Sequence, residues 1–258
     1  MQIHVINLKE AVERRKSITS QLKKLRLRYE IFEAVRGSSL SEKELAEKVD
    51  MQEVAKYPNW LTPNMLGCSL SHLGVYKRIA ESGTDWHLVL EDDVELDSNI
   101  VRFIDLFEKT GDRFQSHIIL LYGIVMSGNL KLYKEPLFEE SGRKVHKVLS
   151  DQHVGSTGAY LIHKQTAIKM LKNNPLVKVA PDTWHFFRDQ GSFEQLNWVY
   201  PFLSKPAFFE STIGYVKKDS LKYKLKHFVE KYKLPILFSL LKRSRKKLFE
   251  RMSRVDFG

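Results

Sequence analysis

Short apolar runs alternate with segments of helical period along this chain, and that alternation constrains its fold more than any other feature. Five runs are suited to strands, namely residues 3–8, 29–35, 87–90, 118–122 and 158–162. The segments whose apolar residues recur at helical spacing are 9–27, 41–54, 64–80, 100–109 and 164–172. Strand–helix alternation of this kind is typical of an α/β domain with a mainly parallel sheet. A strand-and-turn pattern over 130–148 predicts a hairpin within it.

The composition limits the class of protein. A hydrophobic fraction of 43% with 28% charged residues is ordinary for a globular domain. Cys68 is the only cysteine, so an internal disulfide is impossible and a reducing compartment is favoured. Residues 1–8 are typical of a buried strand and not of a signal peptide. No run approaches the roughly 18 apolar residues that a membrane span requires. We therefore expect a cytoplasmic protein.

The positive charge is concentrated at one end of the chain. The net charge is +11, and residues 217–258 hold 14 Lys and Arg against 4 Asp and Glu. Residues 1–216 therefore carry only about +1. A nucleic-acid-binding enzyme usually spreads its basic surface over the folded domain, so no nucleic-acid partner is expected. The division predicts a domain at 1–216 and a basic helical tail at 217–258.

The tail has the pattern of basic amphipathic helices. From Asp219, Leu221, Leu225 and Phe228 share one helical face, and Pro235 separates a second segment beyond it. Leucines on one face and lysines around them suit an anionic membrane surface, which would place the protein at the inner membrane as a peripheral component. The alternative is that the apolar faces pack on the parent domain while the lysines stay solvated.

Three carboxylates follow directly on a buried strand. Residues 87–90 are apolar, and Glu91, Asp92 and Asp93 come next. Ligands of open α/β sheets bind at the carboxyl ends of strands. Side chains alternate along a strand, so Glu91 and Asp93 are expected on one side and Asp92 on the other. Two carboxylates on one side suit Mg²⁺ or Mn²⁺.

Other interpretations of the triplet remain open. Acidic residues also open helices, because the helix dipole favours them there. A metal-dependent nuclease or nucleotidyltransferase would use Glu91 and Asp93 as ligands and the tail for nucleic acid. A non-enzymatic basic membrane adaptor would use the triplet only as a helix cap. The nearly neutral body argues against the nuclease.

Several motifs resemble glycosyltransferase family 25, which includes lipopolysaccharide and collagen galactosyltransferases. The matching stretches are Ile6-Asn7-Leu8 followed by Arg14-Arg15, Phe32-x-Ala34-Val35-x-Gly37, Gly67-Cys68-x-x-Ser71-His72, Leu90-Glu91-Asp92-Asp93, Gly158–Ile162 and Pro181-Asp182. The resemblance covers about residues 1–215, and its G-C-x-x-S-H and L-E-D-D motifs are specific in combination. Phe208-Phe209-Glu210 departs from the polar residues that the family has before its Ser-x-Ile segment.

The resemblance implies a GT-A-like fold and an inverting β-galactosyltransferase. The enzyme would move a hexose, most often galactose, from a UDP-sugar to a saccharide acceptor of lipopolysaccharide or lipooligosaccharide, which is expected to be lipid-linked. A divalent ion, Mn²⁺ or Mg²⁺, would be held by Asp93 and Glu91 as this chain's DXD element. The donor contacts implied are Asn7, Leu8, Arg14, Arg15, Ala34, Glu91 and Asp92.

Two residues are candidates for catalysis. Inversion needs a carboxylate that takes the proton of the acceptor hydroxyl, and Asp182 beside Trp184 suits that role because aromatic faces support sugar rings. Asp182 is equally suited to cap a helix. His72 would border the donor or acceptor pocket, or be structural. Ser71 lacks a nucleophile elbow, and Cys68 is expected to be buried and inert. Lesser candidates, for a further metal ligand or an acceptor contact, are His153, His185 and Asp189.

Overall fold

The alternation of strands and helices is seen in the computed structural model, which describes residues 1–58, 61–207, 209, 229 and 235–258. The α-helices are α1 (Val12–Lys24), α2 (Glu42–Lys48), α3 (Met51–Val54), α4 (Pro63–Glu81), α5 (Ile100–Thr110), α6 (Lys164–Asn173), α7 (Trp184–Asp189) and α9 (Pro235–Met252), with 3-10 turns η1 (Gly37–Ser39) and η2 (Gly111–Phe114). The strands are β1 (Gln2–Asn7), β2 (Glu30–Glu33), β3 (Trp86–Glu91), β4 (Val94–Leu96), β5 (His117–Leu120), β6 (Ile124–Val125), β7 (Leu130–Leu132), β8 (Phe138–Glu140), β9 (Arg143–Lys147), β10 (Val154–Gly155), β11 (Ala159–His163), β12 (Gln195–Tyr200), β13 (Ser204–Pro206) and β14 (Val255–Phe257).

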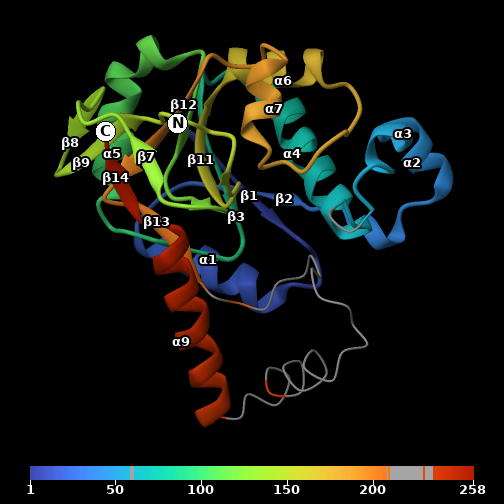
Figure 1. Ribbon diagram of the computed structural model, residues 1–258, viewed down its shortest axis with the longest axis horizontal. Helices are drawn as coiled ribbons and strands as arrows, with labels where there is room; N and C mark the ends of the chain where they lie inside the picture. The colour runs from blue at the N-terminus through green and yellow to red at the C-terminus, as the bar shows by residue number, and fades with distance from the viewer. Residues whose placement is uncertain (59–60, 208, 210–228, 230–234) are drawn as a thin grey trace.

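An eight-stranded sheet forms the centre of the domain, in the order β2-β1-β3-β11-β5-β12-β9-β8 (Figure 1). β1 pairs in parallel with β2 and β3, and β5 pairs in parallel with β12. β11 is antiparallel to both of its neighbours, and β9 is antiparallel to both of its own. Six strands therefore share one direction while β9 and β11 oppose it. The predicted α/β class with a mainly parallel sheet is confirmed, and the predicted hairpin is β8–β9.

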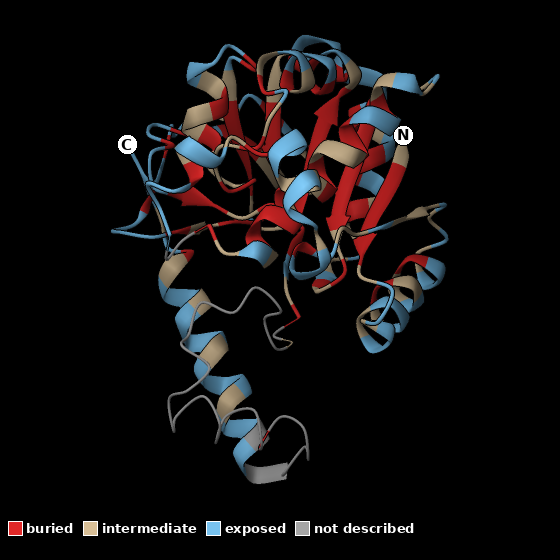
Figure 2. Ribbon diagram, turned by 90° about the vertical axis from the view of Figure 1, so that its right-hand side faces the viewer, coloured by how far each residue is buried: buried red, intermediate tan, exposed pale blue. Residues whose placement is uncertain are grey.

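Helices cover both faces of this sheet, so its central strands are buried on both sides (Figure 2). In β3, Leu88 and Leu90 belong to the core that α1 and α5 cover, whereas Val89 belongs to the core beneath α4, α6 and α7. This explains why residues 87–90 read as an uninterrupted apolar run instead of alternating with polar residues. The strand can end only where water or polar partners are available, which is at Glu91.

Helix α4 is held against the end of β2 by a close approach of two glycines. A Cβ atom on Gly67 would lie 2.5 Å from the backbone nitrogen of Gly37, closer than real side chains allow. Ser71 Oγ accepts a hydrogen bond from Val35 N at 2.8 Å and donates one to Gly67 O at 2.7 Å. Ser71 is therefore a structural residue, and the same contacts fix the position of His72, its neighbour on α4.

Two buried histidines meet at the opposite end of the sheet. His4 Nε2 and His87 Nδ1 lie 2.9 Å apart, and both side chains are fully buried. His87 Nε2–H donates to Thr84 O at 2.8 Å, so in a neutral ring Nδ1 must accept. Burial lowers the pKa of His87 to about 4, although the hydrogen bond to Thr84 O raises it and offsets part of this shift.

We expect the protein to lose stability as the pH falls from about 7.5 to about 5. The folded-state pKa of His87 lies below its unfolded value of 6.5. The unfolded chain therefore binds the proton first, and the stabilisation present above pH 6.5 declines toward the folded pKa. Between these two pH values the expected loss from this group is roughly 2 kcal/mol. Urea unfolding at the two pH values measures it, with His87→Gln expected to flatten the profile. Equal stability at both pH values would contradict this role.

The end of the chain lies on the domain. β14 pairs in parallel with β7, and Phe249 packs edge-on against Tyr122 with ring centroids 6.0 Å apart. The rest of α9 extends away from the sheet, and Leu237, Leu240 and Leu248 are exposed (Figures 1 and 2). The second predicted amphipathic segment thus falls within a helix. The first, from Asp219 to the residue before Pro235, lies almost wholly outside the described residues, and the boundary at 216/217 stays a prediction. Among the described helices none is long and apolar enough to cross a membrane.

Candidate active site

The carboxyl ends of β1, β2 and β3 meet at one edge of the sheet. Ile6 is in register with Glu91, and Asn7 with Glu33. Ala34 N donates to Asn7 O at 2.9 Å, which continues the pairing of β1 and β2 by one residue. Because parallel strands end at the same edge, Asn7, Leu8 and Ala34 lie beside the acidic triplet. The structure thus brings these three predicted donor contacts together with Glu91.

Asp92 and Asp93 occupy a tight turn between β3 and β4. The expected alternation of side chains therefore stops at Glu91. Arg14 shows this, since its Nη1 lies 3.0 Å from Asp92 Oδ1 and 3.4 Å from Asp93 Oδ2. The prediction that Asp92 points away from Asp93 was wrong in this respect, because a turn does not keep the strand's period of two. The triplet does not open a helix either, since β4 follows it.

Asp92 is fully engaged by its neighbours. It is buried, and its Oδ2 accepts from Asn7 Nδ2 at 2.7 Å while Oδ1 accepts from Arg14. Asp93 has a more open environment, with 30% of its side chain exposed and Arg14 as a longer-range partner. Asp92 is therefore a positioning residue for Asn7 and Arg14, and Asp93 is the carboxylate of the turn that is available to a ligand.

The loop before β11, the strand next to β3, completes the site. Because β11 runs antiparallel to β3, the start of β11 lies beside the end of β3, and Glu91 N donates to Gly158 O at 2.8 Å. Thr157 Oγ1 donates to Glu91 Oε1 at 2.6 Å. Sequence reasoning missed Ser156 and Thr157. Their signal is a Ser-Thr pair between Gly155 and Gly158, immediately before a buried strand.

His72 contacts the acidic triplet directly. Its side chain is almost fully buried, and its Nε2 lies 3.3 Å from Glu91 Oε1. Its Nδ1 lies 2.9 Å from the hydroxyl of Tyr160, which in turn donates to the hydroxyl of Tyr76 at 3.0 Å. The imidazole is therefore held at both nitrogens. His72 therefore lies beside the acidic triplet, and its role in the pocket stays a prediction.

Asp182 lies on the same side of the sheet edge. Its Oδ2 accepts from Ser156 N at 3.1 Å, and Thr183 occupies the N-cap position of α7, so the helix-cap interpretation of Asp182 is wrong. Burial raises the pKa of Asp182, the bond from Ser156 lowers it, and the charge of Glu91 raises it again, with a net increase. The charge of Glu91 is therefore close enough to act on Asp182.

Trp184 does not offer a surface for a sugar ring. Its side chain is fully buried, its ring packs against Tyr160 with centroids 5.4 Å apart, and its Nε1 donates to Ser156 O at 3.2 Å. The expectation that it supports a sugar was wrong, because α7 turns this face into the core. Trp184 instead supports the backbone of Ser156, which has the unusual φ of +93° for a residue other than glycine.

The site holds more negative charge than the described residues neutralise. Arg14 is the cation that forms ion pairs with the turn. Burial first, and then the charge of Glu91, raises the pKa of Asp93 to about 7. Burial also raises the pKa of Glu91, but His72, Thr157 and Arg14 outweigh it and the net shift is downward. Near neutral pH, Asp93 therefore binds a proton that a divalent cation could replace. Carboxylate oxygens are the ligands that Mg²⁺ and Mn²⁺ prefer, so this donor set fits such an ion.

Cys68 is half-buried beside this cluster, one helical turn before His72. Burial raises the pKa of its thiol, and the charges of Glu91, Asp182, Asp93 and Asp92 add to the increase. The resting form is therefore the thiol, which agrees with the expectation of an unreactive cysteine. The charges of these four carboxylates therefore act on Cys68 together.

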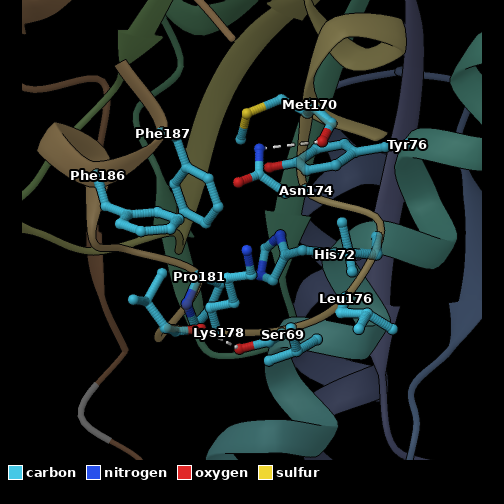
Figure 3. Close-up of a pocket in the computed structure, with 13 residues that line it drawn as sticks. Ser69, His72, Tyr76, Met170, Asn174, Leu176, Lys178, Pro181, Phe186 and Phe187 are labelled. Atoms are coloured by element: carbon cyan, nitrogen blue, oxygen red, sulfur yellow. Dashed lines mark hydrogen bonds between the residues drawn. The ribbon is translucent and has the colours of Figure 1, made fainter. Parts of the chain in front are cut away.

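The remaining predicted residues lie outside this cluster. Arg15 and His153 are exposed, and the exposed Asp189 pairs with Arg188 at 3.0 Å. A cavity of about 20 Å³ lies behind His72, between Tyr76, Asn174 and Phe187 (Figure 3). That volume holds a single water, so the cavity is too small for a sugar.

Comparison with known proteins agrees with the geometry of the site. The model for "Glycosyltransferase family 25 (LPS biosynthesis protein)" matches residues 1–184. A "Glycosyltransferase 25 family member" of Drosophila pseudoobscura pseudoobscura is 28% identical over 193 residues, which cover 69% of this chain and 28% of that protein. The human procollagen galactosyltransferase 2 is 28% identical over 184 residues, which cover 70% of this chain and 29% of that protein. The chain thus spans less than a third of the length of these two relatives.

Among solved structures, a galactosyltransferase, LgtC, in complex with donor and acceptor sugar analogs aligns with 77% of this chain and 73% of its own, at 14% identity and a TM-score of 0.37. That score is too low to carry an argument. The family match extends from β1 to the start of α7 and includes every residue of the acidic site from Asn7 to Asp182. A GT-A-like α/β domain is in keeping with this match. The chain belongs to glycosyltransferase family 25.

Proposed function

We propose that this glycosyltransferase moves galactose from UDP-galactose, with inversion, to a saccharide acceptor of lipopolysaccharide. The observation that supports this most is the cluster of Glu91, Asp93 and Asp182 at the sheet edge where Asn7 and Ala34 also lie. Galactose is chosen over other hexoses because relatives of this chain are named as galactosyltransferases. The family's description as an LPS biosynthesis protein supports the choice of a lipopolysaccharide acceptor.

The end of β3 and the turn after it would hold the donor's diphosphate through a divalent ion. Asp93 and Glu91 are the proposed ligands, because Asp92 is already saturated by Asn7 and Arg14. A bound Mn²⁺ or Mg²⁺ supplies positive charge that neutralises the departing diphosphate. Arg14 is 12% exposed, and its guanidinium lies between the turn and the Phe209 ring, 5.9 Å from the ring centroid. It would add a fixed positive charge on the donor side.

Asp182 is the proposed general base. It must be ionised to take the proton of the acceptor hydroxyl, and a base acts best when its pKa is not far below the working pH. Burial of Asp182 and the charge of Glu91 raise its pKa in that direction. The hydrogen bond from Ser156 N fixes one carboxylate oxygen, which leaves the other free to face an acceptor.

A screen of nucleotide sugars tests the proposed donor. UDP-galactose with Mn²⁺ and a truncated lipooligosaccharide acceptor should give faster release of UDP than UDP-glucose or UDP-N-acetylglucosamine. Matched reactions without acceptor measure hydrolysis of the donor. Turnover of a nucleoside triphosphate or an oligonucleotide, with none of any UDP-sugar, would favour the nucleotidyltransferase or nuclease interpretation and remove this one.

We further propose that α9 binds the anionic surface of the inner membrane, where a lipid-linked acceptor would lie. Exposed Leu237, Leu240 and Leu248 accompany the basic residues of α9. Each basic residue near an anionic leaflet contributes about 1 kcal/mol, and salt screens that attraction.

Vesicles of phosphatidylglycerol and phosphatidylcholine should therefore sediment the protein at low salt and release it at high salt. A variant with Lys242, Arg243, Lys246 and Lys247 changed to Gln keeps β14 in place and should lose most of the binding. Sedimentation that is equal for both proteins, or equal with pure phosphatidylcholine, would contradict the membrane proposal.

A further inference from the structure

A second set of potential metal ligands overlaps the acidic site. Cys68 and His72 occupy the same face of α4, one turn apart, and Glu91 lies opposite them at the end of β3. Cys68 Sγ, a ring nitrogen of His72 and a carboxylate oxygen of Glu91 all lie within 4.8 Å of one another. Sulfur, imidazole nitrogen and carboxylate oxygen form a donor set that suits Zn²⁺ better than Mg²⁺.

His72 can present a lone pair to this set. Its Nδ1 lies 2.9 Å from the Tyr160 hydroxyl, which can accept its hydrogen, and its Nε2 faces Glu91 Oε1 at 3.3 Å. In the neutral tautomer with its hydrogen on Nδ1, the lone pair of Nε2 points toward Glu91 and is available to a metal ion.

The surroundings of the two ligands are those of a metal site. Metal-binding histidines commonly donate their other ring N–H to an oxygen that fixes the ring, and the Tyr160 hydroxyl, 2.9 Å from His72 Nδ1, can be that oxygen. Glu91 is likewise fixed by Thr157 Oγ1 at 2.6 Å. Ligands of a tetrahedral Zn²⁺ lie roughly 3.3–3.8 Å apart, given bonds of about 2.0–2.3 Å. The present spread of up to 4.8 Å would close with a change of about one ångström, which rotation of the Cys68 side chain could provide.

We propose that Cys68, His72 and Glu91 bind a thiophilic divalent cation such as Zn²⁺, with water at the fourth position. Glu91 is common to this set and to the proposed Mn²⁺ site. The two ions therefore compete, and Zn²⁺ should inhibit transfer. This inhibition rests on the proposed function, whereas binding of the thiophilic ion does not.

Cobalt spectroscopy of the whole protein tests the binding directly. Co²⁺ bound to a thiolate gives a charge-transfer absorption in the near ultraviolet, and Cys68 is the only cysteine in the chain. Titration with Co²⁺ should produce this band with one ion per chain, and Zn²⁺ should abolish it. Cys68→Ser should lose the band, while Asp93→Asn, which keeps all three ligands, should retain it. His72→Gln should weaken Co²⁺ binding at least tenfold, but the band should still form at saturating Co²⁺ because the Cys68 thiolate remains a ligand.

The outcomes separate the two proposals. Absence of the band in a folded wild-type protein, or one Co²⁺ per two chains, would overturn the site. Retention of the full cobalt affinity in Cys68→Ser would do the same. In the transfer assay at fixed Mn²⁺, the concentration of Zn²⁺ for half inhibition should rise at least tenfold in Cys68→Ser. If no UDP-sugar is turned over by any variant, the proposed function fails but the cobalt result still decides the thiophilic site.

Discussion

Asp93→Asn should reduce glycosyl transfer by roughly 10³-fold or more, the scale expected when a metal ligand at a developing charge is lost. Among the described residues, Asp93 is the more exposed carboxylate of the turn, and it forms an ion pair with Arg14. Its replacement removes a charge that only a cation or a proton can balance, since its pKa of about 7 reflects burial and repulsion by Glu91. Initial rates of UDP release at saturating donor measure the effect.

The control for Asp93→Asn is a second carboxylate two residues along. Glu95→Gln removes an exposed ion pair with Lys205, worth about 1 kcal/mol or less, and should leave transfer nearly unchanged. Without metal, Asp93→Asn should be at least as stable as the wild type, because it relieves repulsion with Glu91. Full, chelator-insensitive activity in Asp93→Asn would show that Asp93 holds no metal that matters for transfer.

Asp182→Asn should reduce turnover by about 10²- to 10⁴-fold, the usual contribution of a general base. The amide keeps the size of the side chain and can still accept from Ser156 N, so the loop from Gly155 to Gly158 should hold its position. Binding of UDP with Mn²⁺ should stay within a few-fold of wild type. Stopped assays of turnover, together with calorimetry of UDP binding, separate the two effects.

The pH dependence of the wild type tests the same assignment. A base must lose its proton to act, so turnover should rise with pH through a pKa above the ordinary value of 3.8 and then level off. Asp189→Asn is a matched control, because Asp189 is exposed and paired with Arg188. Turnover of Asp182→Asn near that of wild type would assign the base to another carboxylate.

The sequence predicted the part of the site that depends on local patterns. An apolar run that ends in acidic residues indicates the end of a buried strand, and parallel β1 and β3 then bring Asn7 and Glu91 to one edge. The spacing of Cys68 and His72 on a helix also follows from the sequence. That this face of α4 meets Glu91 does not, since it depends on the close approach of Gly37 and Gly67.

The rest of the site depends on strand direction. In a fully parallel sheet the start of β11 would lie at the opposite edge from Glu91. Because β11 is antiparallel to β3, Thr157 reaches Glu91 and Ser156 reaches Asp182. No local pattern fixes that direction, because a buried strand is apolar on both faces whichever way it runs. The same limit applies to Trp184, whose burial depends on the placement of α7.

Calorimetric titration of UDP into the whole protein tests the central claim, that the acidic turn binds a nucleotide diphosphate through a divalent ion. We expect UDP to bind with one site per chain in the presence of Mn²⁺. Binding should fall at least tenfold when a chelator replaces the metal, and Asp93→Asn should show the same loss with Mn²⁺ present. Glu95→Gln should bind as wild type does. UDP affinity that is unchanged by the chelator and by Asp93→Asn, or no UDP binding by the folded wild type, would contradict the account.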